Sequence, residues 1–212
     1  GDAGNDTIYG GSGNDDIVVG AGDDTVNAGD GQDWVLAGTG HDVYVGGSGF
    51  DTLDYTEMAG NLTIDLSKHI ATIGGDTHEM SGFEQVFGTR NDDHITGDKG
   101  DNTLNGGSGN DWIRGGQGWD ILRGGDGSDT FAFTKKDVAG SAADHIADFV
   151  LGTDKLDLSD FLKGGKSAAD VIHLEAAANG TMVQAQVNGA LVDVALLEHV
   201  DVQQASHYDL LA

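Results

Sequence analysis

The sequence contains no cysteine and no proline among its 212 residues. Without cysteine, a disulfide framework and the thiolate ligands of structural zinc sites are both excluded. No apolar run approaches the ~20 residues of a membrane-spanning helix, and no amino-terminal signal peptide is visible. Because the sequence begins inside a repeat and without Met, we expect it to be part of a longer protein whose export signal lies at the carboxyl end.

Basic residues are also scarce, with 10 Lys and Arg against 36 Asp and Glu and a net charge of −26. Such a polyanion is a poor candidate for binding nucleic acid or anionic lipid. Catalytic motifs are missing as well: His78-Glu79 lacks the second histidine of H-E-x-x-H, and no serine occurs in G-x-S-x-G. We therefore predict no catalytic residue, no organic cofactor and no enzymatic activity in this sequence.

Glycine is abundant, with 36 residues, and it follows a period of nine. Six consecutive nonapeptides cover residues 1–54, and five more cover residues 88–132. Position 4 of the unit is glycine except at Asn91, and position 6 is Asp except at Asn102. Position 8 is apolar in all eleven units: Ile8, Ile17, Val26, Val35, Tyr44, Leu53, Ile95, Leu104, Ile113, Leu122 and Phe131.

A single apolar residue between polar neighbours predicts a very short strand at positions 7–9, with position 8 facing a thin core. Positions 1–6 form a turn, where glycine permits a positive φ and close backbone approach. Each nonapeptide then makes half a coil, and turns eighteen residues apart stack on the same edge. A repeat of this kind buries its apolar side only by stacking on its neighbours, so we predict an all-β solenoid.

The stacked turns bring like charges together. Residues 1–54 hold eleven carboxylates and no Lys or Arg. A ladder of position-6 carboxylates is repulsive unless cations lie between successive turns. Carboxylate and carbonyl oxygens are hard ligands that select Ca²⁺, so the pattern predicts calcium sites.

The units resemble the repeats-in-toxin (RTX) family signature G-G-x-G-x-D-x-U-x. This resemblance implies a right-handed parallel β-roll in which Ca²⁺ is held between turns by position-6 side chains and by carbonyls of positions 1–4. The implied side-chain ligands are Asp6, Asp15, Asp24, Asp33, Asp42, Asp51, Asp93, Asn102, Asp111, Asp120 and Asp129. The implied carbonyl ligands are those of Gly10, Gly11, Gly13, Gly20, Gly22, Gly29, Gly31, Gly38, Gly40, Gly46, Gly47, Gly106, Gly107, Gly109, Gly115, Gly116 and Gly118.

Carried over to this sequence, the resemblance pairs position-6 residues two units apart. The pairs are Asp6 with Asp24, Asp15 with Asp33, Asp24 with Asp42, Asp33 with Asp51, Asp93 with Asp111, Asn102 with Asp120, and Asp111 with Asp129. We therefore expect roughly seven calcium ions, and fewer if Asn102 weakens its site.

Residues 55–87 interrupt the period between the two repeat blocks, 1–54 and 88–132. Leu62, Ile64 and Leu66 alternate with polar residues, and Gly74-Gly75 marks a turn. We expect extra coils that continue the roll without calcium turns; a separate small subdomain is the alternative.

Residues 133–212 form the last predicted region, a cap. It resembles the segment that follows the last repeat of proteins exported by type I secretion, at Asp144, Ile146, Asp148, Phe149, Gly152, Asp154, Leu156, Asp157, Leu158 and Ser159. Asp144 is a candidate ligand for an end calcium site, although an ordinary cap aspartate is the favoured interpretation. A short helical stretch over 159–170 and strands around a hairpin turn at Asn188-Gly189 follow. The final residues Asp209, Leu210, Leu211 and Ala212 resemble an uncleaved export signal.

Histidine and tryptophan residues in the repeats are expected on the outside. His41 and His94 occupy positions 5 and 7, Trp34 and Trp112 occupy position 7, and Trp119 occupies position 5. Exposed aromatic residues can mark a contact surface; incidental packing on the strand surface is the favoured interpretation here.

Together these features predict a calcium-binding folding and export module at the carboxyl terminus of a secreted RTX protein of the adhesin or toxin class. The expected partners are calcium ions and the type I secretion apparatus, and we expect a monomer located outside the cell or at its surface. The alternative is a module that supports an upstream extracellular enzyme such as a protease, lipase or alginate epimerase.

Overall fold

A computed structural model describes residues 1–164, 167–205 and 210–211. In it the chain winds into a β-roll made of two ten-stranded sheets. The first sheet runs in the order β1 (Thr7–Ser12), β3 (Thr25–Gly31), β5 (Val43–Gly49), β9 (Asp76–Ser81), β8 (Ile70–Ile73), β7 (Thr63–Asp65), β11 (His94–Thr96), β13 (Trp112–Arg114), β15 (Thr130–Ala132) and β17 (Lys155–Asp157). The second runs β18 (Ile172–Ala177), β19 (Gly180–Val187), β20 (Ala190–Glu198), β16 (Asp144–Ile146), β14 (Ile121–Asp126), β12 (Thr103–Ser108), β10 (Gln85–Phe87), β6 (Thr52–Asp54), β4 (Trp34–Leu36) and β2 (Asp16–Val18).

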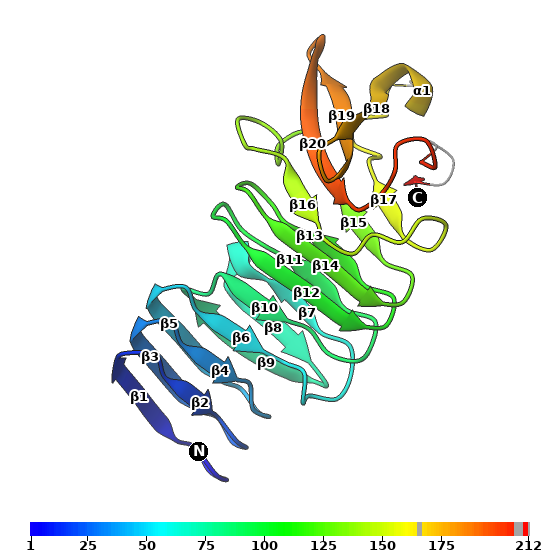
Figure 1. Cartoon of the computed structure of the whole chain (residues 1–212). Coiled ribbons are helices and arrows are strands. Elements are labelled where there is room, and N and C mark those ends of the chain that lie inside the picture. The colour runs from blue at the N-terminus through cyan, green and yellow to red at the C-terminus, as the bar shows by residue number, and fades with distance from the viewer. Residues whose placement is uncertain (165–166, 206–209, 212) are drawn as a thin grey trace.

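Repeat units alternate between the two sheets, so parallel neighbours within a sheet are eighteen residues apart, as Ile8 and Val26 or Ile17 and Val35 are. This confirms the predicted all-β solenoid. Figure 1 shows the coils stacking from β1 at one end to β15 and β17 near the other. The strands β2, β4 and β6 cover positions 7–9 of their units, as predicted, whereas β1, β3 and β5 continue into the following turn.

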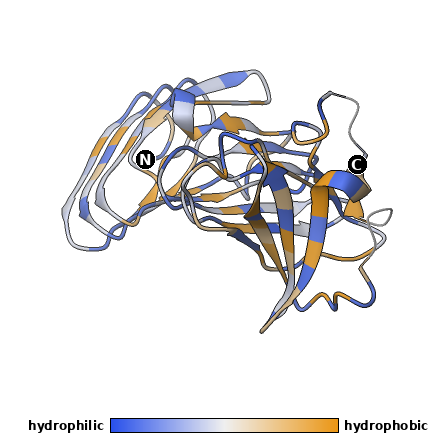
Figure 2. Cartoon of the chain, turned by 90° about the horizontal axis from the view of Figure 1, so that it is seen from above, coloured by the Kyte–Doolittle hydropathy of each residue, from blue (hydrophilic) through white to orange (hydrophobic). Residues whose placement is uncertain are grey.

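The core of the roll is one side chain deep per half coil. Position-8 residues from Val26 to Phe131 are fully buried, while Ile17 is 7% exposed and Ile8 is only partly buried at the first coil. Flanking positions 7 and 9 face outward, which gives the alternating hydrophobic and hydrophilic bands of Figure 2. A core this thin offers little apolar burial per turn, so the turns must contribute to stability.

The interruption at residues 55–87 adds strands to both sheets. In the first sheet, β8 pairs antiparallel with both β7 and β9, which introduces a reversal that the sequence did not lead us to expect. The tight turn between β8 and β9 uses Gly74 and Gly75, both at positive φ (60° and 103°). In the second sheet, β10 keeps the parallel register with β6 and β12, so that sheet stays continuous.

The carboxyl-terminal region covers the far end of the roll. Two strands of this region, β16 and β17, pair parallel with β14 and β15, and the antiparallel strands β18, β19 and β20 project beyond them (Figure 1). The predicted hairpin turn is confirmed, with Asn188 at φ 52° and Gly189 at φ 85°. The predicted helical stretch over 159–170 is largely wrong: residues 159–164 form turns around Gly164, and only α1 (Ala168–Val171) is helical.

Candidate metal centre

The position-6 carboxylates lie immediately before their strands and form a ladder along each edge of the roll. In each step, Oδ1 accepts a hydrogen bond from the backbone N–H of the position-6 residue one coil earlier. The distances are 2.7–2.9 Å for Asp24 on Asp6, Asp33 on Asp15, Asp42 on Asp24, Asp51 on Asp33, Asp111 on Asp93, Asp120 on Asn102 and Asp129 on Asp111. The structure thus brings together all seven pairs that the resemblance implied.

The second oxygen of most of these carboxylates is buried without a hydrogen-bond partner. These orphaned atoms are Oδ2 of Asp15, Asp24, Asp33, Asp51, Asp111, Asp120 and Asp129. A buried, unpaired carboxylate oxygen is costly, and proteins normally satisfy it with a hydrogen bond or a cation. The repeated orphan in the same place on successive coils is what a row of bound cations requires.

Glycine at the turn positions brings backbone carbonyls against the next coil. Gly22 and Gly40 both have positive φ (134° and 122°), and a Cβ on Gly40 would collide with the carbonyl oxygen of Gly22. Position-1 glycines lie against the carboxylates instead: a Cβ on Gly115 would meet Oδ2 of Asp120. Glycine therefore lets carbonyl and carboxylate oxygens of stacked turns share one small space.

This donor set fits Ca²⁺. The oxygens are carboxylates from two successive coils and backbone carbonyls, which are the ligands calcium prefers in proteins. In the described residues, no three His, Cys, Asp or Glu side chains gather as a metal site, which agrees with sites that depend on backbone oxygens. Calcium bound there would supply the positive charge that the stacked carboxylates lack.

Burial makes the ionised carboxylates of the ladder unfavourable in the absence of a cation. It raises the pKa of Asp111 and of Asp120 to about 7, and neighbouring carboxylates raise it further. Burial likewise raises the pKa of Asp51, Asp93 and Asp129 above the ordinary value. Desolvation and like charge both oppose the anion, so these groups are neutral or cation-bound in a stable fold.

Three carboxylates outside the nonapeptides extend the ladders. Each accepts a hydrogen bond from the backbone N–H of a position-6 residue: Glu84 from Asp51 (2.9 Å), Asp144 from Asp120 (3.0 Å) and Asp154 from Asp129 (3.0 Å). Asp144 thus occupies a ladder position rather than an ordinary turn of the cap, and burial raises its pKa to about 8. Sequence reasoning missed Glu84 and Asp154, although each stands two residues before a buried apolar residue, as a position-6 Asp does.

On the first sheet the ladder stops at the antiparallel strands. Asp42 faces the fully buried ring of His78, with 3.1 Å between Nδ1 and Oδ2, and also accepts a hydrogen bond from Tyr44. Burial lowers the pKa of His78. The ladder resumes at Asp93, where the backbone N–H of Leu62 donates to Oδ1 at 2.7 Å.

Asn102 stands in the ladder as its register predicts. Its backbone N–H donates to Asp120, and its own Oδ1 accepts from the backbone of Asp98 at 2.9 Å. The amide therefore keeps the geometry of the turn but brings no negative charge.

The other residues singled out from the sequence lie on the surface. Trp34 and Trp119 are each 39% exposed, and Trp34 stacks on Phe87 (5.3 Å between ring centroids). His94 stacks on Trp112 with 4.0 Å between centroids, which supports incidental packing on the strand surface.

The predicted export signal is described only in part. Asp209 and Ala212 lie outside the described residues, whereas Leu210 is buried and Leu211 forms a parallel bridge with Leu156. None of the helices within the described ranges has the length and apolarity needed to span a bilayer.

Comparison with known proteins places this geometry in a family. The model described as RTX calcium-binding nonapeptide repeat (4 copies) matches residues 1–26 and 19–53, and the model described as Peptidase M10 serralysin C terminal matches residues 41–211. No curated protein matches the chain. Among solved structures, the extracellular lipase LipA from Serratia marcescens is 18% identical with a TM-score of 0.33, over 99% of this chain and 38% of the lipase.

The chain thus spans about 38% of the length of that lipase. The two matched families bind calcium and carry no catalytic centre of their own, and they mark a protein exported by type I secretion. The chain belongs to the serralysin C-terminal family and carries RTX calcium-binding repeats.

Proposed function

We propose that this region is a calcium-triggered folding and export module. The observation that supports it is the row of buried carboxylate oxygens that lack a partner at eighteen-residue spacing. Without a cation the ladders of each edge repel, and the one-residue core is too thin to offset that repulsion. At the low calcium of the cytosol the chain stays unfolded and passes through a secretion channel.

Outside the cell, the paired carboxylates and turn carbonyls form sites that exist only in the stacked coils. Ligand that binds only the folded state stabilises it by about 1.4 kcal/mol per site at a tenfold excess over Kd. Roughly seven such sites contribute about 10 kcal/mol, which is comparable to the whole stability of an ordinary domain. Calcium at millimolar concentration, within reach of sites of the ~10⁻⁴ to 10⁻³ M class, is then sufficient to fold the chain.

The proposal is tested by far-ultraviolet circular dichroism in EGTA and in millimolar calcium. We expect an unordered spectrum in EGTA and a strand spectrum in calcium, with reversal on renewed chelation. Equal strand content under the two conditions would refute the proposal. Magnesium at the same concentration is the matched control, because Mg²⁺ demands octahedral geometry and gives up its water reluctantly.

For the parent protein, we propose the second of the two possibilities raised by the sequence, a module that supports an upstream extracellular enzyme. The match to a family described by its place in M10 peptidases supports this over an adhesin or toxin. The residues that precede Gly1 in the full protein test it: H-E-x-x-H or G-x-S-x-G supports an enzyme, and tandem Ig-like domains would contradict it.

A further inference from the structure

Basic side chains converge on one cavity of this acidic molecule. The cavity has a volume of about 240 Å³, and its lining includes Lys68, Lys99, Arg114 and Lys136. The whole sequence has only 10 Lys and Arg, so four of them meet here. They come from four separate segments: η1 (Leu66–Lys68), the turn after β11, β13 and the loop after β15. The fold, and not proximity in the sequence, gathers them.

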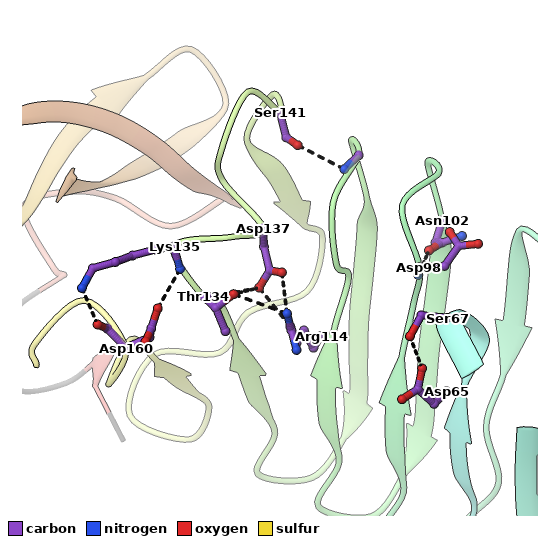
Figure 3. Close-up of polar contacts among 11 residues, drawn as sticks. Asp65, Ser67, Asp98, Asn102, Arg114, Thr134, Lys135, Asp137, Ser141 and Asp160 are labelled. Carbon is purple, nitrogen blue, oxygen red and sulfur yellow. Dashed lines mark hydrogen bonds and ion pairs between the residues drawn. The ribbon is translucent and has the colours of Figure 1, made fainter. Parts of the chain in front are cut away.

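Two of these cations already have carboxylate partners. Arg114 binds Asp137 through two nitrogens, at 2.9 and 2.6 Å, and Thr134 lies on the same network (Figure 3). Lys68 pairs with Asp65 within its own short helix. These pairs fix one wall of the cavity, and the fork of Arg114 is held in place by its bidentate contact.

The other two cations are available to a ligand. Within the described part of the chain, the ammonium groups of Lys99 and Lys136 have no hydrogen-bond or ion-pair partner. The remaining carboxylate of the lining is Asp98, whose Oδ1 accepts from the backbone N–H of Gly100 at 2.8 Å. The cavity therefore carries four cations against three carboxylates, in a chain whose overall charge is −26.

A second hollow adjoins the first and supplies an apolar surface. It has a volume of about 460 Å³, it shares Lys99 and Gln117 with the basic cavity, and Trp119 and Ser141 also line it. Trp119 is 39% exposed, and its ring is held edge-on by His145 at 4.9 Å between centroids. An aromatic plane beside an amide, a hydroxyl and a free ammonium offers both apolar and polar contacts to one ring-shaped ligand.

We propose that these adjoining hollows bind a small acidic sugar. Its anionic group lies between Lys99 and Lys136, and its ring packs on Trp119. The negative charge of the whole molecule disfavours a long polyanion, whereas one or two sugar rings fit the volumes. Gly97 and Gly116, which belong to repeat turns, also line the basic cavity, so the site is complete only when the coils are stacked.

The experiment is a titration of the ¹⁵N-labelled, calcium-loaded chain followed by backbone amide shifts. The probes are sodium glucuronate, glucose and sodium sulfate, each matched with sodium chloride at equal ionic strength. We expect saturable shifts at Gly97, Gly116 and Gln117 with glucuronate, and binding about tenfold weaker for glucose and for sulfate, because each lacks one half of the contacts. Sulfate binding as tight as glucuronate means an inorganic-anion site only and overturns the sugar assignment. No saturable shift with glucuronate overturns the site itself.

Variants assign the binding to the named side chains. Lys99→Met and Lys136→Met should each weaken glucuronate about tenfold, and Trp119→Leu should weaken glucuronate but not sulfate. The matched control is Lys163→Met, whose ammonium is 73% exposed and pairs with Asp160 away from the cavity. Equal loss in Lys163→Met, or none in Lys99→Met, contradicts the proposal. Calcium binding by each variant is measured separately, so a failure of calcium-triggered folding is distinguishable from a failure of sugar binding.

Discussion

Replacing one ladder carboxylate should act with opposite sign in the presence and absence of calcium, and Asp111→Asn is the sharpest case. Asp111 belongs to two pairs, because its Oδ1 accepts from Asp93 (2.8 Å) and its backbone N–H donates to Asp129 (2.9 Å). Asparagine keeps the Oδ1 contact but places an NH₂ group where the orphaned Oδ2 lies. Two adjoining calcium sites lose a charged ligand while the fold of the turn is preserved.

The magnitude follows from linkage. Loss of two sites, each worth about 1.4 kcal/mol at tenfold excess calcium, lowers the free energy of unfolding by about 3 kcal/mol. In chelator the sign reverses, since burial raises the pKa of Asp111 to about 7 and its anion destabilises the fold above that pH. A neutral asparagine removes that penalty.

The assay is thermal unfolding over a range of calcium concentrations. The slope of Tm against the logarithm of calcium concentration reports the number of ions released, so Asp111→Asn should have a smaller slope than the unaltered chain. Asp126→Asn, an exposed aspartate in the following repeat turn, is the control and should leave the slope unchanged. An unchanged slope for Asp111→Asn would refute the assignment of the ladder as the calcium site.

Three further predictions test other parts of the account. Glu84→Gln should reduce the number of bound calcium ions measured by equilibrium dialysis, because Glu84 continues the ladder through the interruption; an unchanged number would exclude it. Gly40→Ala should lower stability in calcium by about 1–3 kcal/mol, since φ is 122° and the new Cβ meets the carbonyl of Gly22, whereas Gly100→Ala, at an ordinary φ, should be tolerated. Burial raises the pKa of Asp144 to about 8, above its value of roughly 4 in an unfolded chain. The penalty is full above pH 8 and vanishes below pH 4, so in EGTA acidification should increase strand content by circular dichroism, and a loss of strand would contradict the sign.

The repeat blocks could be predicted because one rule is applied eleven times. Position 8 has to be apolar and position 6 acidic in every unit, so burial of Leu104 and placement of Asp111 followed from the period alone. Eighteen residues per coil then fixed which carboxylates meet, as in the register of Ile113 with Phe131.

Where the period stops, the sequence no longer determines the geometry. The residues of β8 alternate as strand residues should, but nothing in them distinguishes parallel from antiparallel pairing. Glu84 and Asp154 were missed because the motif was sought at nine-residue spacing, whereas their only local signal is an acid two residues before a buried Val86 or Leu156. The cap helix was overestimated because its apolar residues were read by helical spacing, although Phe161 is buried from a turn.

The most direct test of the central claim is an anomalous-difference map from a crystal of the chain grown in calcium, recorded at long wavelength. The account predicts peaks between successive coils, next to Oδ2 of Asp24, Asp33, Asp111 and Asp120. A map without peaks at those oxygens, from crystals that contain the folded roll, would contradict it.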